Sequence, residues 1–196
     1  MQEQARELLE RIRHFAMPEW FEGSGIDFLW QARVRMAPIM SARVVDSFGG
    51  GRGVLTAKLF GIIPVARSRG PEADMGEALR GLSELPWRPF AFREAPGFAW
   101  EATAADKLRA TFDDGRTRAT FEFEVDADGR VLGGTAASRP RVVGKSVVDT
   151  AWSGAFREYR VFDGLRVPTA AEATWHLPEG PFSYWRGRVT GLRLLR

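Results

Sequence analysis

The chain contains no cysteine. It therefore forms no disulfide and offers no thiolate, either as a nucleophile or as a metal ligand. Histidine is scarce as well, because only His14 and His176 occur. They belong to separate predicted elements and lack the paired spacing of a zinc site. We therefore expect no metal and no cofactor.

Long hydrophobic runs are also missing. The longest apolar stretch covers residues 59–66, includes Pro64 and is too short to span a bilayer. The N-terminus is charged from Glu3 onward and has no apolar centre of the kind found in signal peptides. The sequence therefore predicts a cytoplasmic protein without an integral membrane segment.

Lysine is rare, since only Lys58, Lys107 and Lys145 occur among 28 basic residues. Set against 25 acidic residues, the formal net charge is +3. This excess forms no basic run, so we expect no nucleic-acid partner. Nucleotide motifs are absent too: Gly144-Lys145-Ser146 lacks the upstream glycine of a phosphate-binding loop, because Arg139 occupies that position.

What the chain does have is a large aromatic content, with seven tryptophans and fourteen phenylalanines in 196 residues. A chain of this length fits one domain with a sizeable core, and we assign residues 1–196 to it. The aromatic side chains either fill that core or line a cavity.

The last thirty residues predict two long strands joined by a turn at 179–181. In the first strand, alternate residues from Val167 to Leu177 are mostly apolar, whereas those from Arg166 to His176 are mostly polar. Because successive strand side chains point to opposite faces, this pattern predicts a sheet with one buried and one wetter face.

The rest of the chain has the patterns of two helices and many short strands. Apolar residues at helical spacing predict an amphipathic helix over 2–15, and Pro71 and Pro86 bracket a second helix. Glycine-containing turns separate the strands, and residues 139–153 have the character of a loop. The predicted fold is mainly β (α+β): a single strongly curved antiparallel sheet of about ten strands, forming an open half-barrel whose concave face the two helices cover.

From Gly70 onward the chain resembles a bacterial family of uncharacterised proteins, a resemblance that implies no assigned activity. It is carried by "RGPEADMGEALRGLSELPW", "FEVDADGRV", "WSGAFREYR" and a C-terminal pattern, VPTxxE followed by YWRG. In element order alone, the chain is similar to the half-barrel lipoprotein-carrier fold, whose members hold acyl chains. This similarity implies a fold rather than a function, and the chain differs from the carriers because it lacks an export signal.

Polar residues on the terminal hairpin suggest one candidate catalytic site. Glu172, Thr174 and His176 project from the same face of one strand, and Tyr184 or Arg186 is expected across the hairpin. A carboxylate beside a histidine and a tyrosine can orient an imidazole as a general base. The alternative is a solvated outer face with ordinary cross-strand contacts.

Arginines and tryptophans suggest a candidate binding site. Converging arginines bind carboxylate or phosphate through paired hydrogen bonds, and tryptophans form the walls of apolar pockets. The alternatives are a wet strand face and an ordinary core. The candidate ligand-binding residues are Trp30, Arg33, Arg35, Arg67, Trp100, Arg139, Arg141, Trp175 and Trp185.

Three functions are compatible with this sequence. The first is binding of a hydrophobic or amphipathic small molecule, such as a fatty-acyl or lipid-like compound. The second is a cofactor-independent enzyme that uses Glu172, His176 and Tyr184 for proton transfer. The third is a protein-interaction module with an exposed sheet edge, although the sequence points to no particular protein partner.

Overall fold

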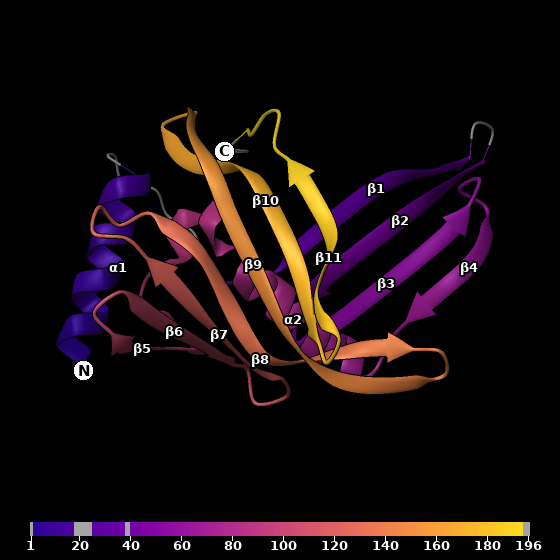
Figure 1. The fold of residues 1–196 in the computed structure, drawn as a ribbon, viewed down its shortest axis with the longest axis horizontal. Coiled ribbons are helices and arrows are strands. Elements are labelled where there is room, and N and C mark those ends of the chain that lie inside the picture. Colours follow the sequence, from indigo (N-terminus) through magenta and orange to yellow (C-terminus); the bar gives the residue numbers. More distant parts are fainter. Residues whose placement is uncertain (1, 18–24, 38–39, 194–196) are drawn as a thin grey trace.

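The strands form two antiparallel sheets in the computed structural model, which describes residues 2–17, 25–37 and 40–193 (Figure 1). In each sheet, neighbouring strands are consecutive in the chain. The four-stranded sheet contains β1 (Phe28–Ala37), β2 (Met40–Gly49), β3 (Arg52–Leu59) and β4 (Ile63–Ser68). The seven-stranded sheet contains β5 (Phe98–Ala104), β6 (Lys107–Asp113), β7 (Arg118–Val125), β8 (Val131–Val143), β9 (Ser146–Phe162), β10 (Leu165–Leu177) and β11 (Gly180–Arg188).

This division corrects the prediction of one strongly curved sheet of about ten strands. Between β4 and β5 the chain forms α2 (Pro71–Ser83) and two short 3-10 helices, η1 (Leu85–Trp87) and η2 (Pro89–Ala91). α2 packs against β2 and β3 of one sheet and against β7 and β8 of the other. Because the helix separates the two groups of strands, β4 and β5 do not pair.

The N-terminal helix is present as predicted. α1 (Gln2–Ala16) buries Ala5, Leu8, Leu9 and Ile12, and it packs against β5, β10 and η2. It therefore covers an end of the seven-stranded sheet, whereas α2 lies between the two sheets (Figure 1). The predicted turn near Pro38 lies outside the described residues. In the described part of the chain, neither helix has the length and hydropathy needed to cross a membrane.

The second helix starts at Pro71 and ends at Ser83, before Pro86, as predicted. A residue that precedes proline is disfavoured in the α conformation, which opposes continuation of the helix through Leu85. The chain instead turns through η1 and η2, which bury Pro86, Pro89 and Ala91. These turns carry Trp87 toward β10, where its indole Nε1 donates to the Pro168 carbonyl at 2.7 Å.

The segment 139–153, which the sequence predicts as a loop, is a β-hairpin. β8 continues to Val143, and β9 starts at Ser146 after a turn at Gly144 and Lys145. The valines on both arms are β-branched and therefore favour extended backbone. They are also exposed, so this part of the hairpin extends beyond the buried sheet and lacks the alternation of a half-buried strand.

A glycine in β3 allows α2 to approach the four-stranded sheet closely. The Gly53 amide donates to Asp74 Oδ1 at 2.7 Å, and a Cβ at Gly53 would overlap the Ala73 carbonyl and crowd Glu77. Gly53 pairs with Phe48 of β2, two residues after Asp46. The close approach therefore helps to bring Glu77 of α2 beside Asp46.

Replacement of Gly53 by alanine is expected to destabilise the protein by about 1–3 kcal/mol, because the added methyl group forces β3 and α2 apart. The matched control is Gly76→Ala. Gly76 lies inside α2, and the position that an alanine Cβ would take is open space, so its replacement should stabilise the helix by about 0.5–1 kcal/mol. Urea unfolding of both variants measures the two changes. A Gly53→Ala protein as stable as the wild type would show that the contact is loose.

Candidate functional site

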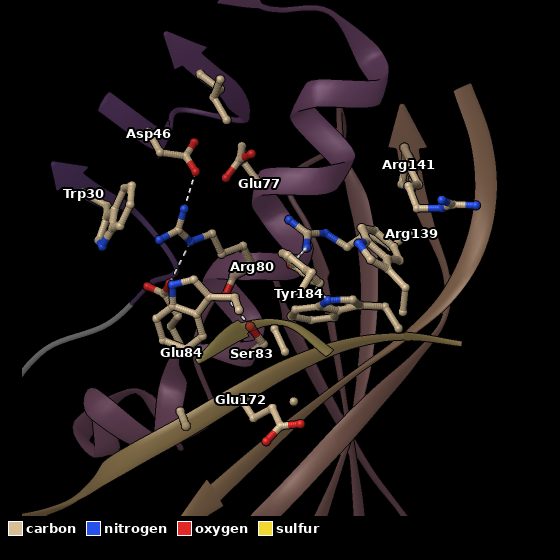
Figure 2. A pocket seen from close by; sticks show the side chains of 18 of the residues that line it. Trp30, Asp46, Glu77, Arg80, Ser83, Glu84, Arg139, Arg141, Glu172 and Tyr184 are labelled. Atoms are coloured by element: carbon tan, nitrogen blue, oxygen red, sulfur yellow. Dashed lines mark hydrogen bonds and ion pairs between the residues drawn. The ribbon is translucent and has the colours of Figure 1, made fainter. Parts of the chain in front are cut away.

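A pocket of about 320 Å³ lies between the two sheets, next to α2 (Figure 2). Its walls come from β1, β2 and β3 on one side and from β8 to β11 on the other. The lining is mainly aromatic, with a set of charged side chains. The aromatic members are Trp30, Trp87, Trp152, Phe156, Trp175, Tyr184 and Trp185, and the charged members are Asp46, Glu77, Arg80, Glu84, Arg139, Arg141 and Glu172.

A bulge in the terminal hairpin places two aromatic residues at this pocket. Ala173 pairs with Trp185 while Thr174 pairs with Ser183, so Tyr184 is an extra residue in β11. A bulge of this kind lets consecutive residues lie on the same side of a strand. Tyr184 and Trp185 both line the pocket, and the Tyr184 ring stacks on Trp175 at a centroid distance of 5.5 Å.

A second bulge, in β8, places two arginines at the pocket. Ala136 pairs with Trp152 and Arg139 pairs with Thr150, which leaves one extra residue in β8 between these pairs. The extra residue shifts the alternation, so Arg139 and Arg141 share the face of Trp152. Both arginines line the pocket and are half-buried.

The Arg139 guanidinium is held against the aromatic wall. Its Cζ lies 4.5 Å from the ring centroid of Trp152 and 5.5 Å from that of Trp175. Nη2 donates to the Gly76 carbonyl at 3.1 Å, and Nη1 donates to the Tyr184 hydroxyl at 3.2 Å. Arg141 donates through Nε to Thr150 Oγ1 at 3.2 Å. Neither arginine has a carboxylate partner among the described residues, so both retain N–H donors for an anion.

On the opposite side, the pocket has a buried acidic pair. Asp46 of β2 and Glu77 of α2 are only 3% and 7% exposed, and Figure 2 shows their carboxyl groups facing each other. Arg80 forms an ion pair with Asp46 through Nη1 and with Glu84 through Nε at 2.7 Å. Its guanidinium also lies over the Trp30 ring, 4.7 Å from the centroid.

Burial raises the pKa of Glu77 to about 8, and the negative charge of Asp46 and a hydrogen bond between the two carboxyls add to this effect. The positive charges of Arg139 and Arg80 act in the opposite direction and lower the pKa. That hydrogen bond requires one of the carboxyls to carry a proton. Asp46 Oδ1 and Glu77 Oε2 are buried and accept no hydrogen bond from an N–H or hydroxyl group of the described residues. At neutral pH, Glu77 is therefore mainly a neutral carboxylic acid.

The structure does not bring together the three residues proposed for proton transfer. Glu172 is held by Arg186 and Ser183, whose hydrogen bonds lower its pKa to about 2, with a further contribution from the charge of Arg157. His176 is exposed, and its Nε2 lies 2.8 Å from Ser153 Oγ. The bulge turns Tyr184 to the pocket side. Arg186 pairs with Glu172 across the hairpin as predicted, but no base–tyrosine contact forms.

The predicted binding residues divide into two groups. Trp30, Arg139, Arg141, Trp175 and Trp185 line the pocket. The other four do not line it: Arg33, Arg35, Arg67 and Trp100. The three arginines of this second group are exposed on β1 and β4, so the arginine cluster converges only in part. Trp100 packs in the core instead, stacked on Phe98 at a centroid distance of 5.7 Å.

No role was predicted for the polar stripe formed by Glu77 and Arg80 of α2 and by Glu84, which directly follows the helix. Their spacing, i, i+3 and i+7, places them on one helix face. A polar helix face normally lies in solvent. Here the four-stranded sheet covers it, which converts the stripe into a pocket wall. In the described ranges, no three His, Asp or Glu side chains are grouped so that they could hold a metal.

These features define a mainly β protein with two antiparallel sheets and an aromatic pocket that contains paired charges. The chain belongs to a family of unknown function (DUF6544), which matches residues 3–187. None of the curated proteins matches its sequence.

One solved structure is similar to the chain, that of a LolA superfamily protein from Nitrosomonas europaea. The sequence identity is 14% and the TM-score 0.45, and the match covers 98% of this chain and 94% of that one. A likeness of this size carries no information about a ligand.

Proposed function

We propose that this protein binds a hydrophobic or amphipathic small molecule, fatty-acyl or lipid-like in character, in the pocket between the sheets. The observation that carries the proposal is the composition of the pocket, in which aromatic walls are combined with two arginines that have no carboxylate partner. Sites for small ligands are concave, mostly apolar and equipped with a few placed polar groups.

The apolar part of the ligand would lie against Trp152, Trp175 and Trp185, where burial contributes about 25 cal/mol per Å². An acidic end would lie at Arg141, whose Nη atoms donate no hydrogen bond within the described residues, and at the remaining N–H groups of Arg139. The volume of about 320 Å³ lies near the lower end of the range for such sites, which favours a ligand with one short chain.

Titration with decanoate is expected to change the intrinsic tryptophan fluorescence, because five tryptophans line the pocket. Replacement of Arg141 by glutamine should weaken decanoate binding about tenfold or more, since a hydrogen bond to a charged group contributes about 1.5–3 kcal/mol. Binding of decanol, which has no charge, should change little.

Arg33→Gln is the matched control, because Arg33 is exposed on β1 and does not line the pocket. It should leave both affinities unchanged. If neither decanoate nor decanol alters the fluorescence or is retained during gel filtration, the proposed function is wrong. Equal weakening by Arg33→Gln and Arg141→Gln would place the ligand elsewhere.

A further inference from the structure

The Asp46–Glu77 pair has two buried carboxyl oxygens at the wall of the pocket whose hydrogen bonding depends on the proton that the two groups share. Asp46 Oδ1 and Glu77 Oε2 accept no hydrogen bond from an N–H or hydroxyl group of the described residues, although both side chains are more than nine-tenths buried. Both residues line the pocket. Buried polar atoms normally have partners, because an unpaired one costs free energy. A partner from outside the chain is therefore required whenever both groups are ionised.

The charges around the pair indicate which sort of partner fits. Arg80 is shared between Asp46 and Glu84, so its positive charge is offset by two carboxylates. Arg139 faces Glu77 from β8, but its N–H groups bind the Gly76 carbonyl and the Tyr184 hydroxyl. Asp46, Glu77 and Glu84 together exceed Arg80 and Arg139 by one negative charge when all are ionised. One further positive charge would therefore balance this corner of the pocket.

We propose that the Asp46–Glu77 pair is a subsite for a protonated amine, so that the ligand of this pocket carries an ammonium group as well as an apolar chain. The inference rests on the proposed function, because the chain of the same ligand occupies the aromatic part of the pocket. An ammonium group has three N–H donors and no acceptor, and it pairs with carboxylate oxygens. Trp30 lies on the same side of the pocket and already has a cation, Arg80, over its ring.

Amine binding at this subsite is coupled to loss of the proton that the two carboxyls share. The groups that face Glu77 are Asp46 on β2, Arg80 on α2 and Arg139 on β8. With the pKa of Glu77 raised to about 8, the neutral acid predominates below that pH, and the ammonium ion has to displace the proton. Amine affinity therefore rises with pH up to about 8 and then levels off.

The test compares decylamine, decanol and decanoate by tryptophan fluorescence at about pH 8.5, where decylamine is still protonated. Decylamine is expected to bind at least about tenfold more tightly than decanol, since only the amine adds a charged hydrogen bond. In Glu77→Gln, which keeps the shape of the neutral acid, this preference should disappear while decanol binding persists. Glu101→Gln is the matched control, because Glu101 lies on β5 outside the pocket.

The pH profile provides a readout that a structural role for Glu77 would not give. From about pH 6 to about pH 8, decylamine affinity should rise about 50-fold in the wild type and stay flat in Glu77→Gln. Decanol affinity should be flat in both. If Glu77→Gln does not fold, proton release on decylamine binding to the wild type, measured by calorimetry in two buffers, gives the same answer.

The outcomes separate the two proposals. If decanol and decanoate bind but decylamine has no advantage, or if its advantage survives in Glu77→Gln, the ammonium subsite is wrong and the proposed function stands. Amine binding without proton release at about pH 7 also overturns the subsite. If none of the three compounds binds, the pocket is not a site for alkyl ligands, and both proposals fail.

Discussion

Replacement of Arg80 by methionine is expected to lower the free energy of unfolding by about 3–5 kcal/mol. Arg80 is the ion-pair partner of the buried Asp46, and its removal leaves that carboxylate in an apolar setting between a sheet and a helix. Glu77, already a neutral acid next to it, supplies no compensating charge. Urea denaturation followed by circular dichroism measures the loss.

Two further variants serve as controls for that result. Arg118→Met removes a comparable pair with Asp113 on the exposed face of the sheet, and it should cost less than about 1 kcal/mol. The double variant Asp46→Asn with Arg80→Met removes both charges, so it should recover part of the stability lost in Arg80→Met. If Arg80→Met unfolds no more easily than Arg118→Met, the buried pair contributes nothing to stability.

Phe123→Ala is the second substitution with a large expected effect, about 3–5 kcal/mol of stability. Phe123 lies on β7, is fully buried and makes edge-to-face contacts with Phe121 and Phe92, at centroid distances of 4.9 and 5.1 Å. Truncation opens a cavity where β7 and the segment around η2 meet. The decrease in urea midpoint at constant m-value measures the change.

Phe182→Ala is its matched control, because Phe182 on β11 is 56% exposed and its removal leaves no cavity. We expect a change below about 1 kcal/mol. If Phe123→Ala costs no more stability than Phe182→Ala, the core around β7 is loosely packed. In that case the pocket between the sheets would not hold a fixed shape.

Much of the secondary structure could be predicted because its causes are local. The alternation from Arg166 to Leu177 predicts β10, and four of the six residues on the predicted inner face, Val167, Thr169, Ala171 and Ala173, are buried. The apolar spacing of Leu8, Leu9 and Ile12 predicts α1 in the same way. Glycine turns, such as that at Gly129, mark the hairpins. The hairpin at 139–153 was missed because its exposed valines lack a buried face.

The candidate site could be predicted only in part. Residue type pointed to tryptophans and arginines, and five of the nine line the pocket. Type alone could not separate Arg139 from Arg33, since both are arginines on strands. Nor could it identify Glu77, because an acidic residue on a helix is usually a solvent-facing one.

The sequence by itself determined most of the strands, the two helices and the supply of aromatic and arginine side chains, because these follow from spacing, turn residues and composition within short segments. The tertiary structure alone decided the rest. Two bulges turn Arg139, Arg141 and Tyr184 toward the pocket, and the packing of α2 between two sheets buries Glu77 against Asp46. Both depend on contacts between residues far apart in the chain, which no local pattern encodes.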